Sequence, residues 1–411
     1  MEEWKEYKLG DVATLIIAKA DISLFNRKNY ISTENILPNR SGIKEASSLP
    51  ATGKVTAFCD NDILISNIRP YFKKIWLASF DGGCSNDVIC LRAKKNVLCQ
   101  FLYYLLSQDD FFDYIMLGAK GTKMPRGDRK QIINWGIALP PLKEQQKIVS
   151  ILSSLDNKIA LNRKINSNLE EQAKALFKSW FIDFEPFKGG KFVDSELGMI
   201  PEGWKVGRYD DIIEGTIAGD WGKEKSVGNY LHEVTCIRGC DFQDIKNGLR
   251  GNAPTRFILE KNFKNKRFVS HDILVEISGG TQAVSTGRVC SISQKLIDTY
   301  NGNVVCTNFC RVVRPAEGYS AFAYYSWLYK YDQKVMFGYE NGTSGIKNFR
   351  LNDFLSMEPL IIPPKNIVIE FQNFIDGINS QMQTRGGESS KLENIRDSLL
   401  PKLMSGEIEV K

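Results

Sequence analysis

The first long pattern in the chain is a run of apolar residues spaced alternately four and three apart, with no proline or glycine inside it. Eight of ten successive positions are apolar, and the ten are Ile148, Leu152, Leu155, Ile159, Asn162, Asn166, Leu169, Ala173, Leu176 and Trp180. This spacing predicts a coiled-coil seam on one helix, from about Leu142 to about Phe181. At a rise of ~1.5 Å per residue the helix would be about 60 Å long, too long for one small domain to cover.

Two consecutive positions near the middle of this seam are polar, Asn162 and Asn166. Such residues either mark a weakly packed stretch or form a polar layer that fixes register and partner orientation at some cost in stability. The pattern alone leaves both interpretations open.

A second seam follows in the C-terminal part of the chain, from about Asn366 to about Met404. Its apolar positions are Phe371, Ile375, Ile378, Met382, Leu392, Leu399 and Leu403. Arg385-Gly386-Gly387 interrupts the seam, and two adjacent glycines cost a helix roughly 2 kcal/mol relative to alanine, which predicts a kink or a loop. Because neither helix can bury its apolar stripe locally, we expect the two to pack against each other as an antiparallel coiled coil.

Short β-rich runs precede each long helix. They include NDILISNIRP, HDILVEIS, KIWLASF, DVICLRA, NVVCTNFCRVV and GIALP. Helical stretches interrupt these runs, QFLYYLLSQDDFFDYIM in the first half and SAFAYYSWLYKYDQKVM in the second, and a Pro-Pro pair precedes each long helix. The pattern predicts an α+β protein with two mixed globules, each followed by a long helix.

Landmarks recur in the same order in the two halves, which indicates an internal duplication. The matched pairs are Trp4 with Trp204, Asp62-Ile-Leu-Ile-Ser66 with Asp272-Ile-Leu-Val-Glu276, Cys84-Ser-Asn86 with Cys306-Thr-Asn308, Arg92 with Arg314, Gly121-Thr122 with Gly342-Thr343, and Leu139-Pro-Pro-Leu142 with Ile362-Pro-Pro-Lys365. The offset drifts from about 200 to about 223 residues, as loop insertions in a diverged tandem repeat would produce. A co-linear series of this kind predicts two related globules in tandem.

Composition sets the broad class of the protein. Of the 411 residues, 43% are hydrophobic and 25% are charged, which gives enough apolar surface for at least two cores. No apolar run is long enough to predict a membrane span, and no signal peptide is visible. Nine cysteines scattered through apolar runs favour buried thiols in a reducing cytosol over a disulfide scaffold, so we expect a cytoplasmic protein.

The motifs of several enzyme classes are missing from the sequence. It contains no Gly-x-x-x-x-Gly-Lys-Ser/Thr phosphate loop, no Asn/Asp-Pro-Pro-Tyr/Phe motif of an amino-methyltransferase, and only two histidines. His232, Cys236 and Cys240 fall four residues apart, but VTCIRGC is typical of a strand and turn, which disfavours a zinc site. We therefore expect no catalytic residue, no metal and no cofactor in this chain, and a binding role rather than an enzymatic one.

Basic residues are unevenly placed in a chain of net charge +6. Residues 120–164 hold ten Lys/Arg against three acids, residues 238–267 hold eight against three, and such clusters suit phosphates and base edges better than a merely solvated surface. The predicted guanine contacts are Arg69, Arg126, Arg129, Arg238, Arg256, Arg288 and Arg350. The predicted phosphate neutralisers are Lys73, Lys74, Lys123 and Lys347. Asn67, Thr122 and Thr343 could read bases, although capping a turn is the better interpretation of each alone.

The chain resembles the specificity subunit of Type I restriction-modification systems. The resemblance lies in ALPPLKEQQKIVSILSSLDNKI, LFKSWFIDFEPFKGGKFVDSELGMIPEGW, SLLPKLMSGEIEV and DILISNIRP, which together span both long helices and the boundaries of both globules. Arg385-Gly-Gly departs from the family pattern, in which the second helix usually runs through with helix formers.

The resemblance implies two target-recognition domains, each reading one half of a bipartite site in the major groove of double-stranded DNA. The helix pair would set the spacer between half-sites and dock two modification (methyltransferase) subunits, which restriction subunits can join. Those methyltransferases would bind S-adenosylmethionine and methylate one flipped-out adenine per half-site. The implied boundaries are 1–141 and 201–364 for the recognition domains, 142–184 for the first helix, 185–200 for a linker, and 365–411 for the second helix and tail.

Two other classes of function stay open from the residues alone. One is a non-enzymatic coiled-coil adaptor whose globules bind proteins, and the other is an enzyme with an unrecognised site. Arginine-bearing loops at matched places in the two halves favour DNA recognition over the adaptor, and the missing motifs disfavour the enzyme.

Overall fold

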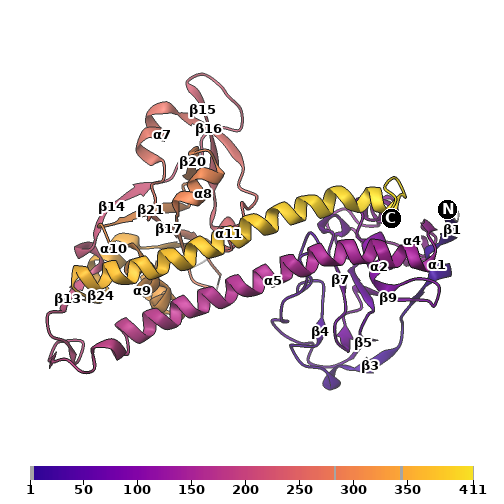
Figure 1. The fold of residues 1–411 in the computed structure, drawn as a ribbon, viewed down its shortest axis with the longest axis horizontal. Helices are drawn as coiled ribbons and strands as arrows, with labels where there is room; N and C mark the ends of the chain where they lie inside the picture. Colours follow the sequence, from indigo (N-terminus) through magenta and orange to yellow (C-terminus); the bar gives the residue numbers. More distant parts are fainter. Residues whose placement is uncertain (1–3, 282–283, 343–345, 411) are drawn as a thin grey trace. The chain divides into compact units, whose positions relative to one another are not determined.

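The chain forms two compact units, each containing one globule and parts of both long helices (Figure 1). The structure is a computed structural model that describes residues 4–281, 284–342 and 346–410. Unit 1 comprises residues 1–157 and 393–411, and unit 2 comprises residues 158–392. The two long helices are α5 (Leu142–Phe181) and α11 (Lys365–Met404), so each of them begins in one unit and ends in the other.

Unit 1 is built from short strands, short helices and the two helix ends. Its strands are β1 (Lys5–Lys8), β2 (Ala13–Leu15), β3 (Lys19–Asp21), β4 (Tyr30–Ile31), β5 (Lys54–Phe58), β6 (Ile63–Ser66), β7 (Ile75–Leu77), β8 (Gly82–Cys84), β9 (Val88–Ala93) and β10 (Gly136–Leu139). Its helices ahead of α5 are α1 (Leu9–Val12), η1 (Ile22–Leu24), η2 (Pro70–Phe72), α2 (Cys99–Leu106), α3 (Asp109–Leu117) and α4 (Arg129–Ile132). The strands form sheets in the orders β2-β9-β6-β7, β3-β5-β8-β4 and β1-β10.

Unit 2 has a similar inventory. Its strands are β11 (Phe192–Val193), β12 (Ile200–Pro201), β13 (Lys205–Arg208), β14 (Ile213–Ala218), β15 (Tyr230–Ile237), β16 (Thr255–Leu259), β17 (Ile273–Glu276), β18 (Ser278–Gly279), β19 (Val289–Ser291), β20 (Val304–Cys306), β21 (Cys310–Pro315), β22 (Glu340–Asn341), β23 (Lys347–Phe349) and β24 (Pro359–Ile362). Its shorter helices are η3 (Glu185–Phe187), η4 (Tyr209–Asp211), η5 (Gly239–Asp241), α6 (Phe242–Lys246), α7 (Glu260–Lys266), α8 (Gln294–Thr299), α9 (Ser320–Asp332), η6 (Val335–Tyr339) and α10 (Leu351–Met357). The sheet orders are β14-β21-β17-β19, β16-β15-β20, β18-β23-β22, β13-β24 and β11-β12.

The central strand of each unit is buried on both faces, which explains its unbroken apolar sequence. In β6, Ile63 and Ile65 enter the core shared with the long helices, whereas Leu64 enters a second core on the other face of the sheet. In β17, Ile273 and Leu274 divide between two cores in the same way. In both units the central strand therefore joins the helices to the rest of the globule.

The duplication predicted from the landmarks is confirmed. The sheet β2-β9-β6-β7 of unit 1 has its counterpart in β14-β21-β17-β19 of unit 2, and β1-β10 has its counterpart in β13-β24. The landmark residues also form the same buried ion pair twice. Arg92 Nε lies 2.7 Å from the carboxylate of Asp62, and Arg314 Nε lies 2.8 Å from that of Asp272. Both aspartates are fully buried and accept a second hydrogen bond from the backbone three residues earlier.

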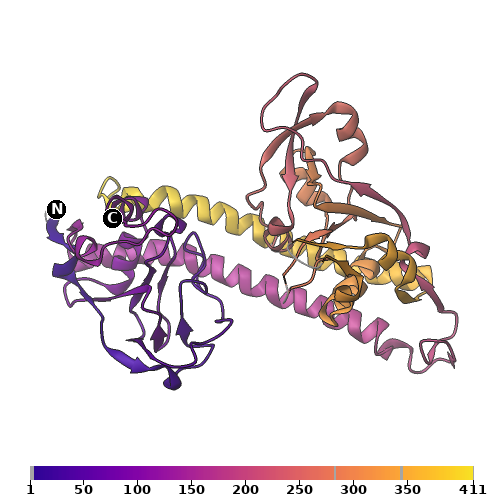
Figure 2. The same ribbon diagram turned by 180° about the vertical axis from the view of Figure 1, so that it is seen from behind.

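The two long helices pack antiparallel within each unit, as predicted. In unit 1, Leu152 of α5 shares a core with Leu403 of α11, and Arg396 Nη1 lies 2.8 Å from the carboxylate of Asp156. In unit 2, Phe177 of α5 packs on Phe371 of α11 and on Phe322 of α9. The ribbons of α5 and α11 in this unit are seen from behind in Figure 2. The predicted seam residues are all buried or half-buried, namely Ile148, Leu152, Leu155, Ile159, Leu169, Leu176, Phe371, Ile375, Ile378, Met382, Leu392, Leu399 and Leu403.

The two polar seam positions make specific contacts with α11 in unit 2. Asn162 Nδ2 donates to the carboxylate of Glu388 at 2.8 Å and to Ser389 Oγ at 3.3 Å. Asn166 Nδ2 donates to the carbonyl oxygens of Met382 and Asn247, at 3.0 Å each. These directed bonds from buried side chains favour a polar layer that fixes register over a weakly packed stretch.

The predicted kink at Arg385-Gly386-Gly387 is wrong, because α11 is helical without interruption from Lys365 to Met404. The physical reason lies in a loop of the globule, where the backbone of Asn247 and Gly248 contacts the helix. A Cβ on Gly386 would lie 2.3 Å from the Asn247 carbonyl oxygen, and a Cβ on Gly248 would lie 2.8 Å from the Met382 carbonyl oxygen. Packing of this loop offsets the low helix propensity, and a glycine is needed on both sides of the contact.

The segment expected to be a linker has structure of its own. Within residues 185–200, Glu185–Phe187 forms a 3₁₀ turn, and Phe192–Val193 pairs with β12 in a short hairpin. Trp204, which follows, is buried and stacks edge-on against Phe184 and Phe187. The start of the second globule is thus packed onto the end of α5 within unit 2.

Candidate nucleic-acid interface

In unit 1 the segment after β6 is paired with a tight turn from residues 120–126. Lys120 and Arg126 exchange two backbone hydrogen bonds of 2.9 Å, so the five residues between them form the turn. Arg126 also bridges to Ile68, and the backbone N–H of Arg69 donates to the Pro125 carbonyl at 2.8 Å. The structure therefore brings together residues that the sequence separates by more than 50 positions.

Unit 2 contains the same arrangement. Strand β22 pairs with β23, which in turn pairs with β18, the segment that follows β17. The register sets Ser278 opposite Asn348 and Gly279 opposite Lys347, as Ile68 faces Arg126 and Arg69 faces Pro125 in unit 1. We call this arrangement the framework. In unit 1 it consists of residues 67–69 paired with the turn of residues 120–126, and in unit 2 it consists of β18, β23 and β22. The backbone pairing is alike in the two units, and the side chains differ.

Each turn begins at a backbone position that suits only glycine. Gly121 has φ +94° and Gly342 has φ +119°, in the left-handed region that other residues avoid. A Cβ on Gly121 would lie 3.3 Å from the Met124 carbonyl oxygen, and a Cβ on Gly342 would lie 3.2 Å from the Ile346 carbonyl oxygen. The Gly-Thr repeat seen in the sequence therefore begins with a glycine of positive φ in both units, and Thr343 itself lies outside the described residues.

Several of the predicted DNA contacts in unit 1 gather on this framework. Thr122, Lys123 and Arg126 are exposed on the turn, and Asn67 lies beside it. Arg129 Nη2 donates to the backbone carbonyl of Asn86 at 2.6 Å, in the loop between β8 and β9. Arg126 Nη2 lies 3.2 Å from the Asp87 carboxylate in the same loop.

The two lysines after η2 are engaged elsewhere in unit 1. Lys73 Nζ lies 2.8 Å from the carboxylate of Asp109, which Arg40 also contacts. Lys74 Nζ donates to the Thr33 carbonyl at 2.6 Å, and burial lowers the pKa of this lysine. Arg69 is half-buried at a left-handed backbone position. Of these, Lys74 has the least freedom to neutralise a phosphate.

In unit 2 two of the predicted arginines hold buried carboxylates of their own globule. Arg288 forms two hydrogen bonds of 2.6 and 2.7 Å with Glu276, and these bonds raise the pKa of Arg288 against the opposing effect of burial. Arg238 does the same with Asp241 at 2.9 and 3.0 Å, again with a raised pKa. Only the donors that remain on each guanidinium could meet a base edge.

Two further predicted residues of unit 2 are Lys347, which is half-buried, and Arg350, which is exposed. Lys347 lies 2.7 Å from Glu340 at the base of the turn. The pKa of Glu340 is lowered because hydrogen bonds from Lys347 and Thr286 outweigh the effect of burial. Arg350 lies 2.7 Å from Asp353, one residue before α10 begins.

Arg256 lies on a different element of unit 2, strand β16. Its guanidinium stacks 4.0 Å from the ring centre of Trp221, and Glu224 lies 3.2 Å away. Lys223 lies over Tyr230 in the same region. A stacked, pre-oriented guanidinium beside an exposed tryptophan is a chemistry that suits nucleic acid. The sequence analysis missed Trp221, since only the fold places it over Arg256.

The sequence analysis also missed residues on the framework itself. Asn86 and Asn308 were recognised as matched landmarks but not as site residues, and both are exposed beside it. Lys19 reaches the side chain of Asn86. Met124 on the turn of unit 1 and Ile346 beside β23 of unit 2 are exposed apolar residues that the sequence analysis also passed over.

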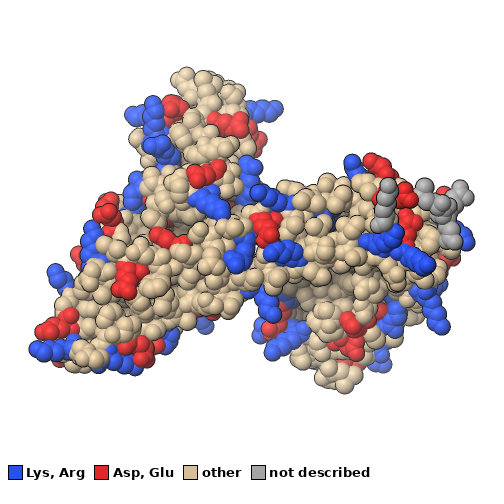
Figure 3. Space-filling view, viewed as in Figure 1, with Lys and Arg blue, Asp and Glu red and all other residues tan. Residues whose placement is uncertain are grey.

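Basic and acidic side chains are interspersed on the visible face of unit 2 that carries β15, β16 and α7 (Figure 3). His232 of β15, one of three residues considered for zinc, stacks on Phe263 with its Nδ1 2.7 Å from Glu260. Cys236 is buried, and burial raises its pKa to about 12. Within residues 4–281, 284–342 and 346–410, no cluster of three His, Cys, Asp or Glu residues is suited to a metal ion, and no helix is apolar and long enough to cross a membrane.

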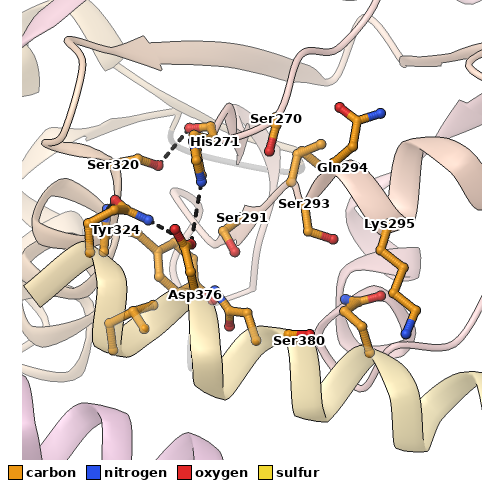
Figure 4. A pocket seen from close by; sticks show the side chains of 16 residues that line it. Ser270, His271, Ser291, Ser293, Gln294, Lys295, Ser320, Tyr324, Asp376 and Ser380 are labelled. Atoms are coloured by element: carbon orange, nitrogen blue, oxygen red, sulfur yellow. Dashed lines mark hydrogen bonds and ion pairs between the residues drawn. The ribbon is translucent and has the colours of Figure 1, made fainter. Parts of the chain in front are cut away.

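A cavity of about 220 Å³, lined by several serine, glutamine and charged residues, lies in unit 2 between the globule and α11 (Figure 4). His271 points across it toward Asp376, with 3.3 Å between Nε2 and the carboxylate. The hydrogen bond that His271 donates to the Asp376 carboxylate raises the pKa of His271, while burial acts in the opposite direction. The cavity lies between the end of the loop that precedes β17 and the first half of α11.

Comparisons with known proteins bear on the whole chain. Residues 1–171 match the family model of the Type I restriction modification DNA specificity domain. The chain is 27% identical to the HindI Type I restriction enzyme specificity subunit of Haemophilus influenzae, over 99% of this chain and 100% of that one. It is 28% identical to the MjaIX specificity subunit of Methanocaldococcus jannaschii, over 77% and 71% of the two chains.

A solved structure has the same fold. The crystal structure of a Type-I restriction-modification system S subunit from M. genitalium aligns with a TM-score of 0.54 at 16% identity. The alignment covers 98% of this chain and 96% of that one.

Proposed function

We propose that this chain, a Type I restriction-modification specificity subunit by sequence and fold, reads a split site in double-stranded DNA through its two globules. The observation that carries the proposal is the repeated framework next to β6 and β17. Each unit offers one such framework, and each would face one half-site in the major groove.

Differences between the two frameworks support two different half-sites. At equivalent backbone positions, unit 1 has Arg69 and Arg126 where unit 2 has Gly279 and Asn348. Arginine pairs with guanine and asparagine with adenine, so one framework with exchanged side chains can read different bases.

The helix pair supports a role as spacer between half-sites and as a docking element. Helices α5 and α11 have 40 residues each, which corresponds to about 60 Å of helix. In the proposed complex two modification subunits bind S-adenosylmethionine and methylate the DNA, restriction subunits join them, and this chain contributes recognition alone. The proposal disfavours an adaptor for proteins, because the exposed arginine and lysine side chains of the turn suit a polyanion.

Selection from random duplexes tests the proposal. The complex of the chain with its cognate modification subunits should enrich duplexes that share two short motifs at one fixed separation. Removing one heptad from each long helix should change that separation by about 10 Å, or roughly three base pairs, and leave both motifs intact. Enrichment of a single continuous motif, or of none, would contradict the split-site proposal.

A matched pair of variants locates the contact. Arg126→Ala removes an exposed guanidinium of the framework and should weaken binding to the selected site by about ten- to 100-fold, while relaxing the preference at one base pair. Lys95→Ala is the control, because Lys95 is exposed beyond the opposite end of β9. Equal effects of the two variants would show that charge alone, rather than the framework, governs binding.

A further inference from the structure

Two aromatic side chains are exposed directly beside the framework of unit 1. Tyr71 and Phe72 belong to η2 and are 48% and 38% exposed, and their ring centres lie 4.7 Å apart. Arg69, the residue before η2, donates its backbone N–H to the Pro125 carbonyl of the turn at 2.8 Å. A single exposed apolar residue needs no explanation, whereas two adjoining aromatic rings form a surface that a partner would cover.

The backbone on both sides of this aromatic pair is held in the left-handed region. Arg69 has φ +51° and Lys73 has φ +50°, and η2 lies between them. Asn39 and Arg40, with φ +53° and +60°, donate backbone hydrogen bonds of 2.9 and 3.1 Å to the carbonyls of Phe72 and Lys73. Within the described part of the chain, these are four of the nine non-glycine residues with positive φ. Such conformations cost free energy and gather at sites that bind a ligand or partner.

Two of the nearby cations hold this segment in place. Arg40 Nη2 and Lys73 Nζ both contact the carboxylate of Asp109, at 2.6 and 2.8 Å. Because they share this carboxylate, we assign them to the support of the aromatic pair and not to a ligand. Two other cations are unpaired among the described residues. Arg69 Nε is buried there without a hydrogen-bond partner, and Lys123 on the adjoining turn is exposed and makes no ion pair with them.

The surroundings of the aromatic pair therefore favour a partner with negative charge next to an apolar group. Double-stranded DNA offers both, since its phosphates attract Arg69 and Lys123 and its major groove contains the 5-methyl group of thymine. That methyl is the apolar group that base pairs present in the major groove, and aromatic side chains contact it. A modification subunit is the competing partner, and it lacks a regular array of phosphates for the two unpaired cations.

We propose that Tyr71, supported by Phe72, contacts the 5-methyl group of a thymine in the half-site that unit 1 reads, and so selects an A·T pair at that position. Cytosine has a hydrogen atom where thymine carries this methyl group, so an apolar contact discriminates between the two pyrimidines. The inference rests on the proposed function and adds to it a base and the residue that reads it.

Replacement of thymine by uracil tests the contact, because uracil pairs with adenine in the same way but lacks the 5-methyl group. Each thymine of the half-site is replaced in turn, and binding is measured with the complex of the full chain and its cognate modification subunits. For the parent protein, one replacement should weaken binding by about three- to tenfold, through the loss of one buried methyl group. Tyr71→Ala should bind the thymine duplex as weakly as the parent protein binds the uracil duplex, and uracil should then have no further effect.

Two variants serve as controls. Tyr71→Phe keeps the aromatic ring and should keep the effect of uracil. Leu24→Ala removes an apolar residue of η1 that is 71% exposed in the same unit. Its binding to both duplexes should stay within twofold of the parent protein.

Three results would overturn the thymine contact. They are a parent protein that binds every uracil duplex as it binds thymine, a Tyr71→Ala variant that keeps the effect of uracil, and a Tyr71→Ala variant that no longer assembles with the modification subunits, which would make the aromatic pair a protein contact. In all three cases a split site selected by the parent complex leaves the proposed function standing. If the parent complex selects no site, the proposed function and the thymine contact fail together.

Discussion

Replacement of Gly386 by alanine should destabilise unit 2, although alanine is the better helix former. The new Cβ would lie 2.3 Å from the Asn247 carbonyl oxygen and 2.4 Å from the carbonyl group of Gly248, and backbone atoms cannot yield as flexible side chains can. The loop must move away, which lengthens the 3.0 Å hydrogen bond that Asn166 donates to Asn247. Overpacking costs roughly 1–3 kcal/mol and the hydrogen bond about 1 kcal/mol, against about 1 kcal/mol gained in helix propensity. The expected net loss is about 1–3 kcal/mol.

Gly387→Ala is the matched control, one residue further along the same helix. No atom outside the local helix backbone lies within 4 Å of its ideal Cβ, so the helix propensity acts alone. This variant should gain up to about 1 kcal/mol. Two adjacent glycines are thus expected to give changes of opposite sign.

Hydrogen exchange of the unit 2 peptides, measured at several urea concentrations, gives the free energy of opening for this unit separately from unit 1. The expected order of stability is Gly387→Ala, then the parent protein, then Gly386→Ala. If Gly386→Ala were as stable as Gly387→Ala, the close contact between the 247–248 loop and α11 would be refuted.

Three further changes test other contacts, each through the stability of its own unit. Asp376 raises the pKa of His271 above its ordinary value of 6.5. The contribution of His271 to the stability of unit 2 is therefore fully present below pH 6.5 and is lost as the pH rises through the raised pKa. His271→Asn should remove a pH dependence of a few tenths of a kcal/mol between about pH 6 and 8. Asp62→Asn should cost unit 1 about 2–4 kcal/mol, because the bidentate bond from Arg92 to a buried carboxylate is lost. Asn166→Asp should cost unit 2 on the order of 3 kcal/mol at pH 7 and less near pH 4, where the protonated carboxyl can again donate.

Each of these three has a clear contrary result. A pH dependence that survives in His271→Asn would place its origin in another group. An Asp62→Asn protein with unchanged unit 1 stability would show that the buried ion pair is not a structural landmark. An Asn166→Asp protein that is equally destabilised at both pH values would indicate steric disturbance rather than loss of the donor.

The duplication and the long helices could be predicted because their signals are local and repeated. The run after Asp62 and the run after Asp272 are apolar throughout, since a strand buried on both faces needs no alternation. The seam from Ile148 onward predicted α5 with its ends at Leu142 and Phe181, because the Pro140-Pro141 pair precedes the helix and turn residues follow it.

Contacts between distant segments could not be predicted in this way. The kink predicted at Gly386 was wrong because its loop partner at Asn247 lies 139 residues earlier in the chain, and no periodicity encodes that approach. The hydrogen-bond partners of Asn162 and Asn166 could not be predicted either. A seam pattern indicates that a position is buried, but it does not indicate which residues contact that position.

In the candidate interface, too, local signals could be interpreted from the sequence and contacts between distant segments could not. Exposed Lys123 and Arg126 lie on the framework as the basic cluster suggested, because the Gly-Thr turn that carries them is a local signal. The sequence could not show that Arg288 and Arg238 are directed at carboxylates of their own globule. Arginine clusters alone do not distinguish a guanidinium that binds DNA from one that holds the fold.

The most direct test of the central claim is a genome-wide map of N6-methyladenine in cells that express the cognate modification subunits with and without this chain. We predict one split motif that appears only when the chain is present, with two unlike half-sites and one modified adenine in each. Exchange of residues 1–141 for those of a relative should change one half of the motif only. A methylation pattern that is the same with and without the chain would contradict its role as the recognition subunit.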